Sequence, residues 1–105
     1  MGKEKNKEIE KFIQALKKKI NVEKVILFGS RARGEHLEDS DIDLIIVSRD
    51  FDAIPFFERM DKLILLWKSN LDLEALCYTP EELEMKKNEI GIVAEALKEG
   101  IELKI

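Results

Sequence analysis

The sequence contains little that could cross-link the chain and nothing that could span a membrane. Its one cysteine, Cys77, excludes an intramolecular disulfide and a cysteine-based zinc cluster, and its apolar surroundings favour a place in the core. No apolar run approaches the roughly 18 residues that a membrane-spanning helix needs. The N-terminal stretch MGKEKNKEIEK also lacks the apolar core of a secretion signal. We therefore expect a cytoplasmic protein with no membrane partner.

Positive charge is also in short supply. The chain has 18 Lys and Arg against 22 Asp and Glu, which gives a net charge of −4. Broad, nonspecific binding to nucleic acid needs a basic face, so nucleic acid is an unlikely partner. The charge does not exclude a nucleotide that is held through a metal ion. A length of 105 residues is near the common size of one domain, and we expect residues 1–105 to form a single domain.

The spacing of the apolar residues predicts helices that alternate with short strands. Helices are expected over residues 3–20, 55–69 and 81–99, the last broken near Gly91, and strands over 24–29, 41–48, 71–78 and 101–105. Thr79, Pro80 and Glu82 form a capping box with proline at the first helical position. Gly100 suits the C-terminal cap of the last helix, and the final strand is expected at a sheet edge.

The first two strands are joined by a connection too short for a comfortable parallel crossover. We therefore expect them to pair antiparallel within a mixed sheet. The continuous apolar stretch after Asp43 indicates a strand that is buried on both faces. The predicted fold class is α/β of the α+β type, with one mixed β-sheet and helices packed on it.

The acidic segment before the second strand contains the strongest chemical signal. Five acidic residues lie between positions 35 and 43, and the last two are Asp41 and Asp43. Residues two apart in a strand point to the same face, roughly 6.6 Å apart, so these two carboxylates converge. They repel each other unless a cation lies between them. Oxygen ligands of this kind suit Mg²⁺ or Mn²⁺, and Mg²⁺ is commonly shared with substrate phosphates.

A glycine-led loop, GSRARG, follows the first strand. Gly29 lets a ligand approach the backbone closely, and Ser30 adds a hydroxyl and an N–H group. Arg31 and Arg33 add positive charge, so the loop is a candidate phosphate cradle, with the triphosphate held between it and two metal ions at the aspartates.

A third carboxylate would complete such a site, and the third strand offers two. Asp72 and Glu74 share one face of an otherwise apolar strand, and either could act as a metal ligand or a general base. We favour Asp72, which lies nearer the start of the strand, and keep Glu74 in reserve. The alternative role for both is that of edge charges that discourage sheet pairing.

A calcium loop is the competing interpretation of the acidic segment. Asp39, Asp41 and Asp43 match its first, third and fifth positions, but the sixth position requires glycine and contains Leu44. The glycine loop is neither a P-loop nor a dinucleotide-binding pattern, since no GK[ST] and no GxGxxG is present.

These residues together resemble the signature of a known family. Gly29-Ser30, Ala32-Arg33-Gly34 and Ser40-Asp41-Ile42-Asp43-Leu44 are similar to the motif of minimal nucleotidyltransferases (MNT) in the DNA polymerase beta-like superfamily. The segments LDLEALCYTPEE and ALKEGIEL also resemble this family, so the likeness covers most of the chain.

The resemblance implies a palm-like mixed sheet and a two-metal enzyme that transfers a nucleotide from a nucleoside triphosphate, most plausibly AMP from ATP. Carried over, Gly29 and Ser30 contact the triphosphate, Asp41 and Asp43 bind metal, and Asp72 is the third carboxylate. Minimal members of the family often pair with a helical partner of the HEPN type, and in some such pairs the small protein is an antitoxin that adenylylates a tyrosine of the toxin. The resemblance therefore allows an antitoxin role here. The alternatives are a non-catalytic partner-binding module and a small-molecule or RNA-end nucleotidyltransferase. The resemblance leaves homo-oligomers open.

Overall fold

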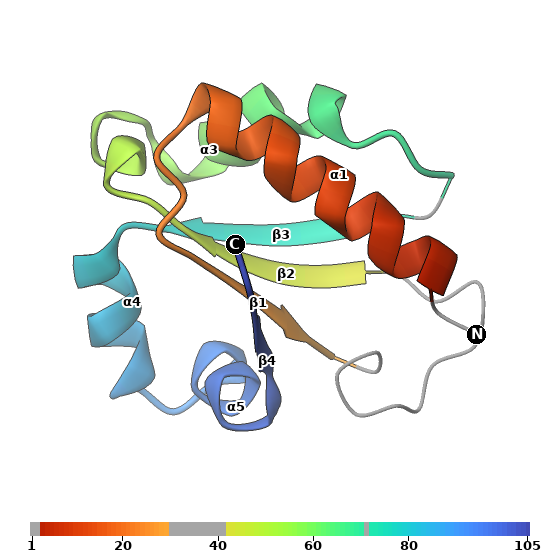
Figure 1. The fold of residues 1–105 in the computed structure, drawn as a ribbon. Coiled ribbons are helices and arrows are strands. Elements are labelled where there is room, and N and C mark those ends of the chain that lie inside the picture. Colours follow the sequence, from red (N-terminus) through yellow and green to blue (C-terminus); the bar gives the residue numbers. More distant parts are fainter. Residues whose placement is uncertain (1–2, 30–41, 71) are drawn as a thin grey trace.

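The computed structural model describes residues 3–29, 42–70 and 72–105 (Figure 1). The helices are α1 (Lys3–Lys19), α3 (Phe56–Leu63), α4 (Pro80–Lys87) and α5 (Ile92–Glu99). The strands are β1 (Lys24–Phe28), β2 (Ile42–Val47), β3 (Leu73–Tyr78) and β4 (Ile101–Leu103). Two short 3₁₀ helices, η1 (Arg49–Ala53) and η2 (Ile64–Leu66), flank α3. No helix in the described ranges is long and apolar enough to cross a membrane.

The four strands form one mixed sheet in the order β3-β2-β1-β4. β1 pairs antiparallel with β2 and β4, whereas β2 and β3 run parallel. The antiparallel pairing of the first two strands is therefore confirmed, as are the α+β class and the edge position of the last strand. Helices cover both faces of the sheet, with α1 and α3 on one side and α4 and α5 on the other (Figure 1).

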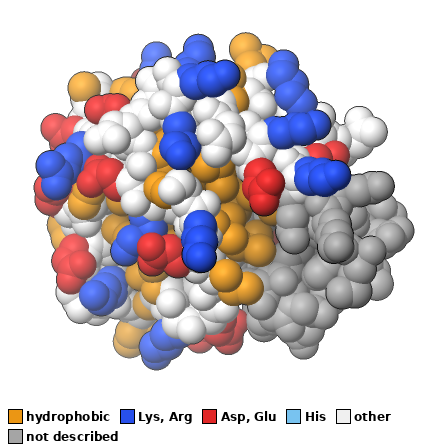
Figure 2. Space-filling view, viewed as in Figure 1, with side chains coloured by type: hydrophobic (Ala, Val, Ile, Leu, Met, Phe, Trp, Pro, Cys, Tyr) orange, Lys and Arg blue, Asp and Glu red, His pale blue; other side chains and the backbone are white. Residues whose placement is uncertain are grey.

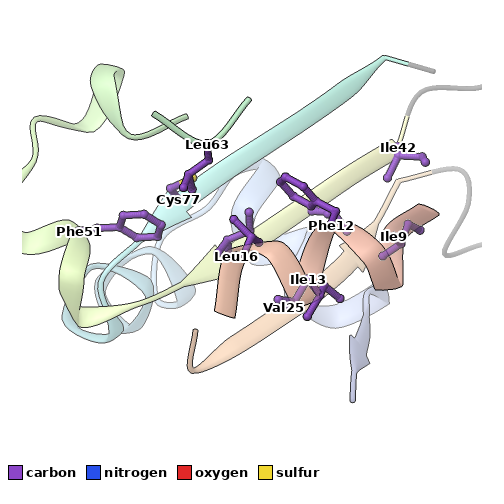
Figure 3. Packing of buried hydrophobic residues seen from close by; sticks show 11 residues of the cluster. Ile9, Phe12, Ile13, Leu16, Val25, Ile42, Phe51, Leu63 and Cys77 are labelled. Carbon is purple, nitrogen blue, oxygen red and sulfur yellow. The ribbon is translucent and has the colours of Figure 1, made fainter. Parts of the chain in front are cut away.

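Strand alternation divides the core between these two faces. Side chains of β2 at Ile42, Leu44 and Ile46 join Phe12 and Leu16 of α1 in one cluster (Figure 3). Their neighbours Ile45 and Val47 point the other way and pack with Phe28, Tyr78 and Val93 in a second cluster. β2 is thus buried on both faces, as its unbroken apolar stretch predicts. Cys77 lies in the first cluster, which confirms its place in the core.

Some predicted bounds were wrong, and tertiary packing explains the longest error. The helix expected over 55–69 ends at Leu63 and continues only as η2, because Trp67 adopts an extended backbone. The Trp67 ring packs edge-on against Phe12 of α1, with ring centroids 5.4 Å apart. η1 was not predicted. In contrast, the capping box at Thr79 and Glu82, the helix break near Gly91 and the Gly100 cap are all present.

A buried arginine ties the C-terminal end of β3 to α3 and α4. Arg59 is only 4% exposed, and its guanidinium donates to the carbonyls of Ile54 and Cys77 and, through both terminal nitrogens, to the Glu82 carboxylate. Hydrogen bonding to Arg59 lowers the pKa of Glu82, and the same bond raises the pKa of Arg59. Burial raises the pKa of Cys77 to about 12. This end of β3 is a structural anchor in which every charge has a partner.

Candidate active site

Two parallel strands present carboxylates side by side at their N-terminal ends. On the face that α5 covers, β2 presents Val47, Ile45 and Asp43, and β3 presents Tyr78, Leu76 and Glu74. In each strand, the residue nearest the N-terminus on this face is acidic. The β2–β3 register pairs Asp43 directly with Glu74. Neighbouring strands lie roughly 4.8 Å apart, so the two side chains leave adjacent points on the sheet. The acids lie where the apolar packing ends.

Gly29 lies against the Asp43 carboxylate. It directly follows β1, whose last residue, Phe28, is the β1 partner of Asp43 in the sheet. Its φ of 77° falls in the left-handed region that favours glycine. A Cβ at this position would overlap Asp43 Oδ2 and lie 3.2 Å from Asp43 Cγ. Only glycine therefore lets the backbone pass the carboxylate at this distance. The predicted approach of a ligand to Gly29 stays a prediction.

These residues line one groove of about 550 Å³ between the sheet and α5. Its floor is apolar where Phe28, Ala75 and Leu76 contribute. Its acidic side chains are Asp43, Glu74, Glu95 and Glu99, and no Lys, Arg or His is among its described lining residues. Glu74 and Glu95 make no ion pair with any described residue. The groove is therefore a place where cations are favoured.

The other predicted site residues divide into two groups. Ser30, Arg33 and Asp41 lie outside the described residues. Asp72 is exposed and precedes β3, and its carbonyl accepts a hydrogen bond of 2.9 Å from the Ile42 N–H group. This bond continues the β2–β3 ladder by one step beyond the Ile42–Leu73 pair. Asp72 does not line the groove, so among the described residues Glu74 is the carboxylate that meets Asp43.

The described residues of the groove offer the kind of ligand atoms that a divalent cation prefers. Asp43 and Glu74 supply oxygen ligands, and Gly29 leaves space beside one of them. Within the described part of the chain, no group of three or more acidic, His or Cys side chains is arranged to hold a metal ion. A complete set would therefore need the predicted Asp41 as well.

Sequence reasoning missed the wall of the groove that α5 provides. Ile92, Glu95, Ala96 and Glu99 recur at steps of three and four, so they form one stripe along the helix. The periodicity was visible in the sequence, but nothing local indicates that this stripe faces the carboxylates of β2 and β3. Arg59 was also missed, although it interrupts the apolar stripe of its helix at a core position.

The fold and the site define a class of transferase, and comparison with known proteins agrees. The family model of the nucleotidyltransferase domain matches residues 9–101. A candidate protein adenylyltransferase from Methanocaldococcus jannaschii is 40% identical over 97 residues, which span 90% of this chain and 92% of the relative. Protein adenylyltransferase MntA from Thermococcus cleftensis is 35% identical over 99 residues, with 90% and 91% covered.

Two solved structures are also similar. A candidate nucleotidyltransferase from Sulfolobus solfataricus superposes with a TM-score of 0.67 at 24% identity, covering 91% of this chain and 76% of that one, and so supports the fold. A toxin–antitoxin structure with AMP-PNP matches with a TM-score of 0.54 at 26% identity, covering 90% and 71%. The chain belongs to the nucleotidyltransferase-domain family as one of its minimal members, and it is a nucleotidyltransferase enzyme.

Proposed function

We propose that this enzyme transfers AMP from ATP to a hydroxyl group of a partner protein. The observation that carries the proposal is the pairing of Asp43 with Glu74 in one groove beside Gly29. The relatives named protein adenylyltransferases support AMP as the transferred group and protein as the acceptor. The toxin–antitoxin neighbour with AMP-PNP supports a toxin as the partner, and we propose the helical HEPN type and a tyrosine acceptor.

In the proposed reaction, the acceptor oxygen forms a bond to the α-phosphorus of ATP. The bond from that phosphorus to the oxygen bridging the α- and β-phosphates breaks, and pyrophosphate leaves. The hydroxyl proton passes to a carboxylate, for which Glu74 and Asp72 are the candidates. Asp43 and Glu74, with Asp41 and Asp72, would hold two Mg²⁺ or Mn²⁺ ions. Such ions, when bound, would offset phosphate charge and the charge on leaving pyrophosphate.

Gly29, Ser30 and Arg33 are proposed to hold the triphosphate. For Gly29 the described geometry supports this role, because its missing side chain leaves the approach to Asp43 open. Ser30 and Arg33 rest on the motif alone. We also propose that residues 1–105 act as one catalytic domain in the cytoplasm, and that the partner supplies the acceptor.

The test is direct transfer of label. The full chain is incubated with ATP labelled at the α-phosphate, Mg²⁺ and the product of the neighbouring gene. We expect label on the partner, and a loss of at least ~10³-fold in Asp43→Asn, because its carboxylate is proposed to stabilise charge in the transition state. Glu10→Gln on the outer side of α1 is the matched control and should keep full activity.

The same assay assigns the third carboxylate and separates the alternatives. Loss of transfer in Asp72→Asn but not in Glu74→Gln would assign that role to Asp72, and the reverse would assign it to Glu74. A binding module would instead neutralise the partner fully in the Asp41→Asn, Asp43→Asn double variant. Label on a small molecule or an RNA end, with none on protein, would favour the third alternative.

A further inference from the structure

The α5 residues that line the groove combine an exposed apolar side chain with acidic side chains. Ile92, Glu95 and Glu99 face the groove, while Val93 and Ala96 anchor the helix in the second core cluster. Asp43 and Glu74 lie on the sheet, so the groove has one acidic wall that carries the proposed metal ligands. Its other wall, α5, carries two acids that the proposed reaction does not use, Glu95 and Glu99. Of these, Glu95 makes no ion pair with a described residue.

An apolar tip lies at the same end of the helix. Ile90, in the connection before α5, is 105% exposed, and Ile92, the first residue of α5, is 71% exposed. Single exposed apolar residues are ordinary, but two isoleucines separated by one residue, of which Ile92 lines the groove, form a patch that a partner can cover. Ile92 belongs to both features, so the tip is continuous with the groove.

The negative charge of the groove favours a positively charged protein segment as its partner. An acidic segment packed beside α5 would be repelled by Glu95, whereas Lys or Arg side chains could pair with it. By contrast, the face that carries α1 displays both signs interspersed (Figure 2). A second copy of this chain, with its own net charge of −4, is poorly matched to the groove.

We propose that the Ile90–Ile92 tip and Glu95 form the docking surface for the acceptor protein, and that the segment carrying its hydroxyl is cationic with apolar residues beside it. This proposal rests on the function proposed above and names the chemistry of its acceptor. The apolar residues of that segment cover Ile90 and Ile92. Its Lys or Arg side chains pair with Glu95, which aligns the hydroxyl with the nucleotide site next to Asp43.

Two fluorescein-labelled peptides of equal length test the surface directly. Each has one tyrosine among leucines, with lysines in the first and glutamates in the second. Affinity for the full chain is measured by fluorescence anisotropy with Mg²⁺ and a non-hydrolysable ATP analogue present. We expect the lysine peptide to bind at least about tenfold tighter, because its lysines can pair with Glu95 whereas the glutamates of the second peptide are repelled by it.

Matched variants separate this surface from general charge and hydrophobicity. Glu95→Lys and the Ile90→Ser, Ile92→Ser double variant should each weaken the lysine peptide about fivefold. Glu10→Lys on α1 changes net charge equally, and Phe57→Ser, Leu65→Ser removes side chains that are 88% and 79% exposed elsewhere. Both controls should stay within about twofold of the unmodified chain.

Equal losses in the control variants, no preference between the peptides or no peptide binding would overturn the proposal. So would a dimer, seen by light scattering, that Ile90→Ser, Ile92→Ser dissociates, because a second copy would then occupy the surface. Binding of the ATP analogue is recorded separately. If the ATP analogue binds but the peptides do not, the nucleotidyltransferase function stands and only the docking surface is refuted. If the ATP analogue does not bind either, the result counts against the proposed function itself.

Discussion

The two ends of β3 handle carboxylates in opposite ways. At the C-terminal end, Glu82 meets Arg59, which is buried, bonded to two carbonyls and in contact with aromatic rings. At the N-terminal end, Glu74 faces Asp43 across the register and has no described cation beside it. The C-terminal end holds a described ion pair, whereas the groove at the N-terminal end has no Lys, Arg or His among its described lining residues. The C-terminal end of β3 therefore stabilises the fold, while the N-terminal end forms the candidate active site.

Apart from replacing the carboxylates themselves, the largest effect should come from adding one methyl group at the N-terminal end of β3, where Gly29 lies against Asp43. Gly29→Ala forces a side chain into the left-handed region and against the Asp43 carboxylate, which must move. A misplacement of about 1 Å can cost about 10²-fold in rate, so we expect transfer to fall at least that far. Affinity for the ATP analogue should fall as well, and Gly91→Ala is the control for that step alone, because Gly91 lies in the proposed docking tip and has a φ of 157° but nothing within 4 Å of an added Cβ. Similar losses of ATP-analogue affinity in both variants would refute the account of Gly29.

The next effect concerns the anchored end. Arg59→Met leaves the Cys77 carbonyl without its Arg59 donor and Glu82 with only the Thr79 N–H. Breaking a buried pair costs about 3–5 kcal/mol of unfolding free energy, and because Glu82 is partly exposed we expect a loss of about 3 kcal/mol. Arg49→Met removes an exposed pair with Glu23, whose atoms are 3.4 Å apart, and should cost at most about 1 kcal/mol. Urea denaturation measures both. Equal losses would mean that the Arg59 contacts contribute little.

A smaller effect should appear in the pH dependence of stability. The folded pKa of Glu82 is lowered below its ordinary value of 4.5, so its contribution is present above that value and is lost as pH falls through the folded pKa. The difference in unfolding free energy between the natural chain and Glu82→Gln should therefore be largest near neutral pH and shrink in acid. In the Arg59→Met background this pH dependence should largely vanish. A difference that stays constant down to acid pH would exclude the ion pair as its cause.

The smallest change involves no substitution. Cys77 is 2% exposed and burial raises its pKa to about 12, so its thiolate is scarce at neutral pH. We expect a thiol reagent at pH 8 to react only as fast as the protein opens, and at once in denaturant. Rapid reaction in native buffer would show that the anchored end of β3 opens readily.

Much of the fold and part of the candidate site could be predicted from local sequence patterns. The elements and the antiparallel start of the sheet follow from the spacing of apolar residues and one short connection. The proximity of Gly29 and Asp43 follows from the same connection, because it joins the two strands that carry them. The capping box at Thr79 was readable because its residues are neighbours in sequence.

The rest depends on contacts between distant segments. The position of Glu74 opposite Asp43 required the β2–β3 register, which leaves Asp72 one step outside β3. The choice of Asp72 as third carboxylate stays a prediction. Glu95 joined the groove only because α5 packs on that face. Arg59 could be seen as an odd residue in an apolar stripe, but its partner lies 23 positions away.

The central claim is that Asp43 and its neighbours bind a metal-bound nucleotide, and thermal unfolding tests it most directly. With Mg²⁺ and a non-hydrolysable ATP analogue at about 100 times its Kd, the natural chain should gain about 10 °C or more in Tm. Asp43→Asn should raise the Tm of the metal-free protein, by relieving repulsion, and abolish that gain. An equal ligand-induced shift in both proteins would contradict the account.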